Sequence, residues 1–183
     1  MFFTDADITF SDVHGPKVNL LANDTVARRY EGYCYSGCVT NRPLLVGETL
    51  HFNISEIETG WMSNMNVGVL YTDPDDLPLG VFVSCAENIS TDVPNSEVFI
   101  FKKFYSENNI YSFRVDKNGV AYLTPNVTSN DVIFANVNVT KKFWVLFNVF
   151  GDTKAIQLLG TSRDDKVDVK DRSWISWLYR QFF

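Results

Sequence analysis

Residues 110–124 read IYSFRVDKNGVAYLT, and this stretch decides the class of fold. Apolar and polar side chains alternate on both sides of Asn118-Gly119, as they do along two half-buried β-strands. Asparagine and glycine both tolerate positive φ, so this pair between two such runs is the strongest local sign of an antiparallel hairpin. The stretch predicts strands over residues 110–115 and 120–124 that pair through a tight turn.

The same two-residue period recurs on both sides of this hairpin. Runs rich in Val, Ile, Phe and Tyr are bounded by Gly, Pro, Asn and Asp, as expected of strands joined by turns. Further strands are expected over residues 50–57, 66–71, 97–102 and 143–150. We count about a dozen short strands and no long helical repeat, which predicts an all-β fold of two packed antiparallel sheets or a barrel.

A second hairpin is predicted near the end of the strand-rich part. Residues 143–150 run into Gly151-Asp152 and then into residues 154–159. A glycine at the first position of a two-residue turn suits a type II′ hairpin. The two flanking runs are therefore expected to pair directly with one another.

Composition places the chain among single-domain globular proteins. It has 183 residues, of which 45% are hydrophobic and 21% are charged, so it can bury one sizeable core. The net charge of −6 opposes binding to a phosphate backbone and argues against nucleic acid as a partner. The N-terminal residues lack a leader pattern, and no apolar run reaches the ~18 residues of a membrane span. A soluble protein is expected.

The three cysteines, Cys34, Cys38 and Cys85, are few and odd in number. Such a count argues against a disulfide framework and fits a reducing compartment, so a cytoplasmic location is expected. A single zinc ion held by these cysteines and one histidine is an alternative that the residue count allows. It is disfavoured because Cys34 and Cys38 lie in a strand-like run and Cys85 is distant in sequence. No cofactor is expected.

Five Asn-X-Ser/Thr sequons argue against a cytoplasmic location and for a secreted protein. A chain rich in Asn and Thr produces some by chance, and two of the five fall in predicted strands, so we interpret the excess as compositional. The alternative, which stays open, is a secreted, lectin-like, carbohydrate-binding sandwich. The sequons begin at Asn23, Asn53, Asn88, Asn126 and Asn138.

No arrangement of residues typical of catalysis is found. His14 precedes Gly15-Pro16 and is interpreted as the entry to a turn, because no nucleophile can be placed beside it. Residues 73–76, Asp-Pro-Asp-Asp, carry three carboxylates but lack the length and the glycine of a calcium loop. They are interpreted as a solvated turn with Pro74 at its second position. The chain is therefore predicted not to be an enzyme.

Binding is predicted instead, through side chains on loops and strand ends at one rim of the sandwich. Arg28 and Arg29 end a predicted strand and point to opposite faces, so one is expected in a structural ion pair and the other on a partner. Trp61 stands beside a turn, where it either caps the core or anchors an interface. The predicted partner-binding residues are Arg28, Arg29, Arg42, Trp61, Met62, Asn64, Asp73, Asp75 and Asp76.

A series of short motifs in a fixed order resembles the neuralized homology repeat. The resemblance extends over about residues 8–160, with a divergent part near residues 80–130 that agrees only in its strand pattern. The motifs are Val13-His14-Gly15, Ala27-Arg28-Arg29, Asn41-Arg42-Pro43-Leu44, Gly47-Glu48, Gly60-Trp61, Gly68-Val69, Asp73-Pro74, Leu77-Pro78, Trp144-Val145, Asn148-Val149-Phe150-Gly151 and Ile156-Gln157-Leu158-Leu159.

The resemblance implies a β-sandwich similar to SPRY and lectin-like folds and a role in protein–protein interaction. In Neuralized-type ubiquitin ligases such repeats recognise targets, including the intracellular tails of Notch ligands, while the ligase activity comes from a RING domain or a SOCS box. The cysteines and histidines of this chain are too few for the two zinc sites of a RING, and residues 173–183 lack the cysteine of a SOCS box. Ubiquitin transfer would therefore need machinery on another chain.

The chain is predicted to divide into a sandwich over residues 1–162, a charged linker over 163–172 and an aromatic tail over 173–183. Apolar residues of the tail recur at helical spacing, which predicts a short helix. The tail either docks on the sandwich or binds a partner or a membrane surface, unless the chain is a fragment of a longer protein. The apolar face consists of Trp174, Trp177, Leu178 and Phe182.

Overall fold

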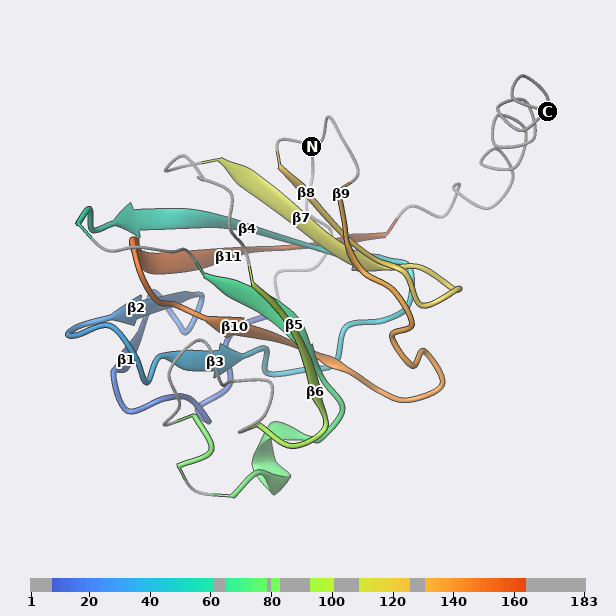
Figure 1. The fold of residues 1–183 in the computed structure, drawn as a ribbon, viewed down its shortest axis with the longest axis horizontal. Helices are drawn as coiled ribbons and strands as arrows, with labels where there is room; N and C mark the ends of the chain where they lie inside the picture. Colours follow the sequence, from blue (N-terminus) through green and yellow to red (C-terminus); the bar gives the residue numbers. More distant parts are fainter. Residues whose placement is uncertain are drawn as a thin grey trace.

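The computed structural model describes residues 8–60, 65–78, 80–82, 93–100, 109–125 and 131–163. Within these ranges it contains 11 β-strands and one short 3-10 helix. The strands form two antiparallel sheets that lie face to face (Figure 1). The prediction of an all-β sandwich built from short strands is confirmed.

The larger sheet has seven strands in the order β1-β2-β11-β4-β7-β8-β9. Its two longest strands, β4 and β11, pair along most of their lengths and form its centre. The strands are β1 (Val18–Leu21), β2 (Val26–Arg29), β4 (Glu48–Ile57), β7 (Ile110–Val115), β8 (Ala121–Pro125), β9 (Asp131–Phe134) and β11 (Thr153–Arg163).

The smaller sheet has four strands in the order β3-β10-β5-β6. Every residue of its two central strands, β5 and β10, is buried, which accounts for their nearly continuous runs of apolar residues. The strands are β3 (Gly37–Val39), β5 (Asn66–Leu70), β6 (Ser96–Ile100) and β10 (Trp144–Asn148).

The hydrophobic core fills the space between the two sheets. Alternate residues of β4, namely Leu50, Phe52 and Ile54, are almost fully buried. The Phe52 ring meets the ring of Phe147 from the opposite sheet edge to face, with centroids 5.1 Å apart. It also stacks on Tyr111 of the neighbouring strand, with centroids 5.5 Å apart. Period-two burial on β4 therefore joins the layers, as expected for a sandwich.

The hairpin predicted from residues 110–124 is confirmed, because β7 pairs with β8 in antiparallel register. The turn is wider than the two-residue Asn-Gly turn. The Gly119 N–H donates to the Asp116 carbonyl at 3.0 Å, and the Asp116 carboxylate accepts from the N–H groups of Asn118 and Val120, both at 2.9 Å. Gly119 takes a φ of 79°. The Asp116 side chain thus replaces part of the hydrogen bonding that a tighter turn would supply.

The second predicted hairpin is wrong. Strand β10 pairs with β3 and β5, whereas β11 pairs with β2 and β4 in the other sheet. Gly151, with a φ of 63°, does form a turn, in which the Thr153 N–H donates to the Phe150 carbonyl at 3.2 Å. That turn carries the chain from one sheet to the other. Both neighbours of β10 in its own sheet, β3 and β5, come from distant parts of the sequence.

Strand β11 ends at Arg163, so the first residue of the predicted linker belongs to the larger sheet. The rest of the linker and the aromatic tail lie outside the described residues. No helix in the described ranges has the length and apolar character needed to cross a membrane.

Candidate partner-binding rims

Strand β5 separates the predicted binding residues into two groups. The loop that contains Trp61, Met62 and Asn64 precedes β5 in the chain, and residues 73–76 follow it. Five residues of extended strand span roughly 17 Å. The prediction that these segments share one rim therefore stays a prediction, because only residues 73–76 of the two segments belong to the described part of the chain. Trp61, Met62 and Asn64 themselves lie outside the described residues.

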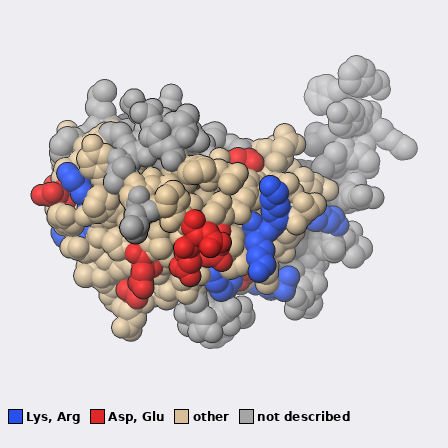
Figure 2. Space-filling view, turned by 90° about the horizontal axis from the view of Figure 1, so that it is seen from below, with Lys and Arg blue, Asp and Glu red and all other residues tan. Residues whose placement is uncertain are grey.

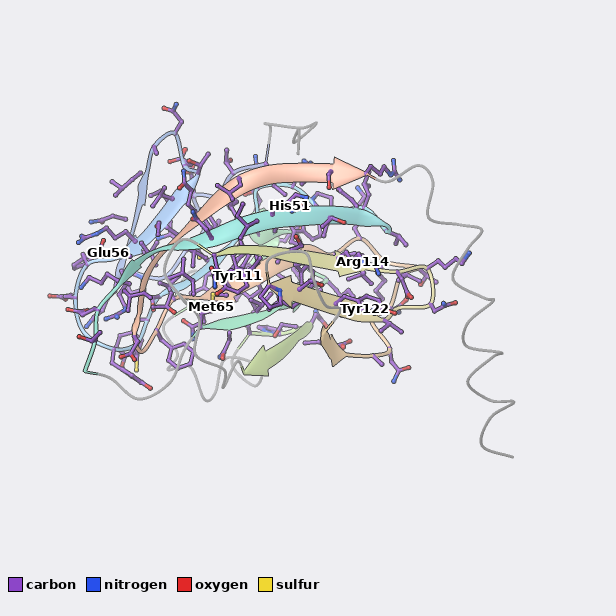
Figure 3. The ribbon with its side chains drawn as sticks, turned by 90° about the horizontal axis from the view of Figure 1, so that it is seen from above. His51, Glu56, Met65, Tyr111, Arg114 and Tyr122 are labelled. Carbon is purple, nitrogen blue, oxygen red and sulfur yellow. The ribbon has the colours of Figure 1, made fainter. Side chains whose placement is uncertain are left out.

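Ion pairs place Arg28 and Arg42 at opposite ends of β4. Arg28 bonds to Glu56, next to the last residue of β4, and Figure 3 shows Glu56 toward one end of that strand, away from His51. Arg42 bonds to Glu48, the first residue of β4. We call the end of β4 with Arg28, Arg29 and Glu56 the arginine rim, and the turn of residues 73–76 that follows β5 the acidic rim.

Arg28 forms a two-pronged ion pair on the outer surface of the larger sheet. Its Nε and one terminal nitrogen donate to the two carboxylate oxygens of Glu56 at 2.6 and 2.9 Å. The hydrogen bond from Arg28 lowers the pKa of the Glu56 carboxyl, and the same bond raises the pKa of Arg28. Both side chains stay partly exposed, at 37% and 40%. A partner could reach Arg28, but would meet a guanidinium whose best donors are already used.

Arg29 is fully buried, with an exposed fraction of 0%. Its guanidinium donates to the carbonyl of Gly32, to the carbonyl of Gly151 at 2.8 Å and to the Glu58 carboxylate at 3.5 Å. Burial is the main cause of its lowered pKa, which the charge of Glu58 partly offsets. Arg29 therefore joins two loops to the end of β4, and its prediction as a partner-binding residue is not compatible with this burial.

Glu58 is the residue of the arginine rim that sequence reasoning missed. It accepts from Lys154 at 2.8 Å as well as from Arg29, and the hydrogen bond from Lys154 is the leading cause of its lowered pKa. The only hint in the sequence is an acid one residue beyond a predicted strand. Its two cationic partners come from β2 and β11, and local patterning does not predict those neighbours.

Arg42 is also held by a carboxylate. Its terminal nitrogens donate to the two oxygens of Glu48 at 2.9 and 3.2 Å, and the Leu45 N–H donates to the same carboxylate at 2.9 Å. Glu48 is 5% exposed. Burial alone would raise its pKa, but the hydrogen bonds from Arg42 and Leu45 outweigh it and the pKa is lowered. The pair fixes the loop between β3 and β4, so its primary role is structural.

The acidic rim presents carboxylates with no such partners. Residues Pro74–Asp76 form the 3-10 helix η1, capped by the Asp73 carboxylate, which accepts from the Asp75 N–H at 3.2 Å. Pro74 is buried, whereas Asp73, Asp75 and Asp76 are exposed. Among the described residues, no side chain bonds to the carboxylates of Asp75 or Asp76. Figure 2 views the side on which η1 lies in Figure 1 and shows acidic side chains gathered near its middle, with basic side chains beside them.

A tyrosine fixes the backbone next to the acidic turn. The Tyr71 hydroxyl donates to Glu97 at 2.8 Å and accepts from the Asn138 N–H at 2.9 Å. Burial is the main cause that raises its pKa to about 12. The end of β5 is thereby joined to β6 and to the loop before β10. The acidic turn stands on a rigid base, as a pre-organised binding loop requires.

Cys34 is disulfide-bonded in the structure, and Cys38 is a free, buried thiol. The prediction that the chain has no disulfide is wrong, because an odd total does not prevent one pair from forming. The zinc alternative fails for the same reason, since a sulfur in a disulfide is not a thiolate ligand. Desolvation raises the pKa of the Cys38 thiol, which keeps it protonated inside β3.

Comparison with known proteins identifies the family of this sandwich. The sequence profile described as Neuralized matches residues 10–160. Protein neuralized from Drosophila virilis is 23% identical over 156 residues, which is 83% of this chain and 20% of that protein. The rat E3 ubiquitin-protein ligase NEURL3 is 25% identical over 171 residues, covering 90% of this chain and 63% of the ligase. The chain thus spans about one fifth of the Protein neuralized sequences it matches.

Solved structures agree on the fold. The neuralized-nhr1 domain of Drosophila melanogaster superposes with a TM-score of 0.73 at 22% identity, covering 83% of this chain and 97% of the domain. The TRIM65 PSpry domain superposes with a TM-score of 0.54 at 12% identity, covering 82% of this chain and 88% of the domain. The expected likeness to SPRY folds is therefore confirmed.

Proposed function

Because the chain belongs to the Neuralized family, we propose that it is a non-enzymatic recognition module that binds an extended peptide or a loop of a partner protein. The observation that carries the proposal is the match of the family profile to nearly the whole described sandwich. Relatives named as E3 ubiquitin-protein ligases support a place for such a module in selecting targets of ubiquitination. The transfer of ubiquitin would then be performed by machinery outside this chain.

The acidic rim is the first contact area in this proposal. Asp75 and Asp76 are exposed on a turn whose backbone is fixed by Asp73 and Pro74. Within the described ranges their carboxylates have no side-chain partner to give up when another protein binds, whereas the donors of Arg28 and Arg42 are already used by Glu56 and Glu48. A partner segment with Lys, Arg or Asn side chains fits this rim, because such groups donate hydrogen bonds to carboxylates.

The loop with Trp61, Met62 and Asn64 is the second contact area. A tryptophan is a common anchor of protein interfaces, and the loop follows Gly60, which has a φ of 115° and nothing within 4 Å of a hypothetical Cβ. Because the strand β5 lies between this loop and η1, the two areas act as separate sites on one partner or on two.

The family resemblance suggests one particular partner, the intracellular tail of a Notch-ligand-like membrane protein. A cytoplasmic location would accompany that partner. The cysteine count that favoured this location no longer does so, because Cys34 is disulfide-bonded. Our proposal therefore concerns the mode of binding, and a Notch-ligand-like tail enters as one arm of the test.

The test measures the dissociation constant of the full chain for a labelled peptide rich in Lys, Arg and Asn, by fluorescence anisotropy. The double variant D75N/D76N should bind this peptide about two- to thirtyfold more weakly, since two exposed charge pairs contribute roughly 0.2–1 kcal/mol each. The matched control is E31Q, which removes one charge from a side chain that is 62% exposed on another loop. Its affinity should stay within twofold of the original.

Three further binding measurements test which contact area and which kind of peptide are involved. An acidic peptide of the same length should bind at least tenfold more weakly than the basic one. W61A tests the second contact area, and a Notch-ligand-like tail replaces the basic peptide in a parallel series. Equal affinity for the basic and acidic peptides would exclude the acidic rim. Unchanged affinity of both D75N/D76N and W61A for every peptide would remove the whole site assignment.

A further inference from the structure

We propose that the loop between β2 and β3 is a further interaction surface, which binds an arginine side chain of a partner protein. This loop, which we call the tyrosine loop, consists of residues 30–35, Tyr-Glu-Gly-Tyr-Cys-Tyr, and leads from the larger sheet to the smaller one (Figure 1). Three features support the inference: two exposed tyrosines, a fixed backbone, and a tyrosine in a conformation that favours glycine. The inference goes beyond the contact areas proposed above and does not depend on them.

The tyrosine loop displays aromatic side chains to solvent. Four large hydrophobic side chains are exposed in the described part of the chain, and two of them are Tyr30 and Tyr35, at 43% and 42%. Both flank Lys17, whose N–H donates to the Tyr35 carbonyl and whose carbonyl accepts from the Tyr30 N–H, each at 3.1 Å. The two tyrosines therefore lie close together and offer the aromatic area that anchors of interfaces provide.

Contacts from both sheets fix the backbone of the loop. The buried guanidinium of Arg29 donates to the Gly32 carbonyl, so the loop adjoins the arginine rim. The ring of Tyr33, in the middle of the loop, packs edge to face on Phe150 with centroids 5.8 Å apart. A loop that is already ordered loses little conformational entropy when a partner binds, and tyrosine adds contact area at low entropic cost.

Tyr35 is the residue that a purely structural role does not explain. It has a φ of 67°, in the left-handed region that bulky side chains rarely adopt. The fold requires this backbone, because the Tyr35 carbonyl accepts from Lys17 and lies against Gly15, where an added Cβ would be 2.3 Å from its oxygen. Glycine would adopt the same angle without strain. Because the side chain is largely exposed, burial does not offset that strain, and such an outlier points to a function.

A cation already contacts this ring. The Lys17 ammonium lies 5.5 Å from the centroid of the Tyr35 ring and 3.7 Å from the Glu31 carboxylate. The faces of aromatic rings attract cations, and Glu31 offsets the charge of Lys17, so that a second cation is not repelled. The Glu31 side chain is 62% exposed and that of Lys17 only 26%. Because Glu31 is exposed and already paired, it adds only a weak attraction, and the ring supplies the main contact.

The charges next to the tyrosine loop also favour a basic partner. Arg28 is paired with Glu56, and both Arg29 and Lys154 are paired with Glu58. The arginine rim therefore presents no excess positive charge, and the whole chain carries a net charge of −6. Arginine suits the site better than lysine, because its planar guanidinium stacks on an aromatic ring while its edge still donates hydrogen bonds.

The experiment titrates the full, isotope-labelled chain with a short Gly-Ser peptide that carries two arginines, and follows the backbone amide signals by NMR. The signals of Lys17 and of residues 30–37 should shift with peptide concentration. A peptide with lysine in place of arginine should bind the loop about threefold more weakly, and one with citrulline, which keeps the shape without the charge, about fivefold more weakly.

Variants of Tyr35 separate binding from stability. Y35G should bind the arginine peptide about fivefold more weakly because the ring is lost, yet its melting temperature should not fall, because glycine adopts the left-handed angle without strain. Y35F keeps the ring and should bind as the original chain does. L45A is the matched control, since Leu45 is 49% exposed on another loop, and it should leave the affinity unchanged.

Several results would overturn the proposal. Equal affinity for the arginine and citrulline peptides, or unchanged affinity of Y35G, would exclude an arginine site on the ring. A marked fall in the melting temperature of Y35G would assign Tyr35 a structural role instead. Shifts of the loop signals when the chain alone is concentrated would assign the loop to a second copy of this chain. The signals of Asp75 and Asp76 report on the acidic rim in the same spectra, so either assignment can fail without the other.

Discussion

Arg29 shows how a charged residue becomes part of a scaffold. A buried guanidinium needs partners for its donors, and the carbonyls of Gly32 and Gly151 together with Glu58 supply them for the two terminal nitrogens. The buried Nε has no hydrogen-bond partner among the described residues. Sequence reasoning placed Arg28 and Arg29 on opposite faces, and the alternation of exposed and buried positions along β2 confirms this. It could not decide which face lies inside, because that depends on loops more than 100 residues away in the chain.

His51 is the residue whose titration we expect to be visible in stability. It is 1% exposed and bonds through its two ring nitrogens to Ser112 at 2.9 Å and to Ser162 at 2.7 Å. Desolvation lowers its pKa from the usual 6.5. The unfolded chain therefore binds a proton near pH 6.5 that the folded chain refuses until lower pH, so stability falls as the pH drops through this window.

The melting temperature of the chain should therefore decrease between pH 7.5 and pH 5.5, and the decrease should be smaller in H51Q. H14Q is the control, since His14 lies in a partly exposed turn. The carboxyls with lowered pKa, Glu48, Glu56 and Glu58, lose their contribution only at lower pH. A pH dependence that is identical in H51Q and in the original chain would contradict the assignment to His51.

At the scale of elements, the strands were predictable and several of their partners were not. Alternation along residues 110–124 fixed the β7–β8 hairpin, because its ends are close in sequence and Gly119 permits the turn. The same alternation could not reveal that Gly151 leads into a different sheet. Pairing between distant strands is decided by burial and packing, which a local pattern does not contain.

Two glycines with the same backbone angle allow the free energy that a side chain would cost in the β7–β8 turn to be measured. Gly47 and Gly119 both have a φ of 79°. An added Cβ meets nothing within 4 Å at Gly47, but lies 2.4 Å from the Val137 carbonyl oxygen at Gly119. G47A should cost about 1–2 kcal/mol for the left-handed backbone alone. G119A should cost that and roughly 1–3 kcal/mol more for the forced shift of Val137.

Denaturation by urea gives both values under identical conditions. Equal losses of free energy in the two variants would mean that the loop containing Val137 yields without strain. In that case the close approach of this loop to the β7–β8 turn is not a fixed feature of the fold.

At the scale of the whole molecule, the two sheets pack on an apolar core, and Cys34, in the segment between β2 and β3, is disulfide-bonded. A native disulfide contributes typically 2–4 kcal/mol, and each kcal/mol corresponds to about 2–4 °C in a domain of this size. A reducing agent should therefore lower the melting temperature by on the order of 10 °C. C34S should melt at the reduced temperature with or without reductant, whereas C38S should still respond to the reductant. A melting temperature that ignores the reductant would contradict the bond.

For the whole chain, the family resemblance predicts the fold but does not identify the binding residues. The sandwich and the family followed from motifs such as Gly47-Glu48 and Trp144-Val145, whose residues are mostly structural in the fold. Glu48 holds Arg42, and Trp144 lies on a buried strand. The proposed binding residues do not share this property, since an exposed position such as Asp75 carries no packing constraint that would mark it in the sequence.

The position of β5 between the two rims sets a minimum length for any ligand that engages both. An extended chain advances about 3.3 Å per residue, so a single segment that runs alongside the five residues of β5 from η1 to Asn66 must extend over roughly 17 Å. A motif of three or four residues would occupy only one end. Two such motifs joined by a flexible linker would bind with an avidity governed by the length of that linker. The sandwich would thus bind long or bipartite targets more tightly than short ones.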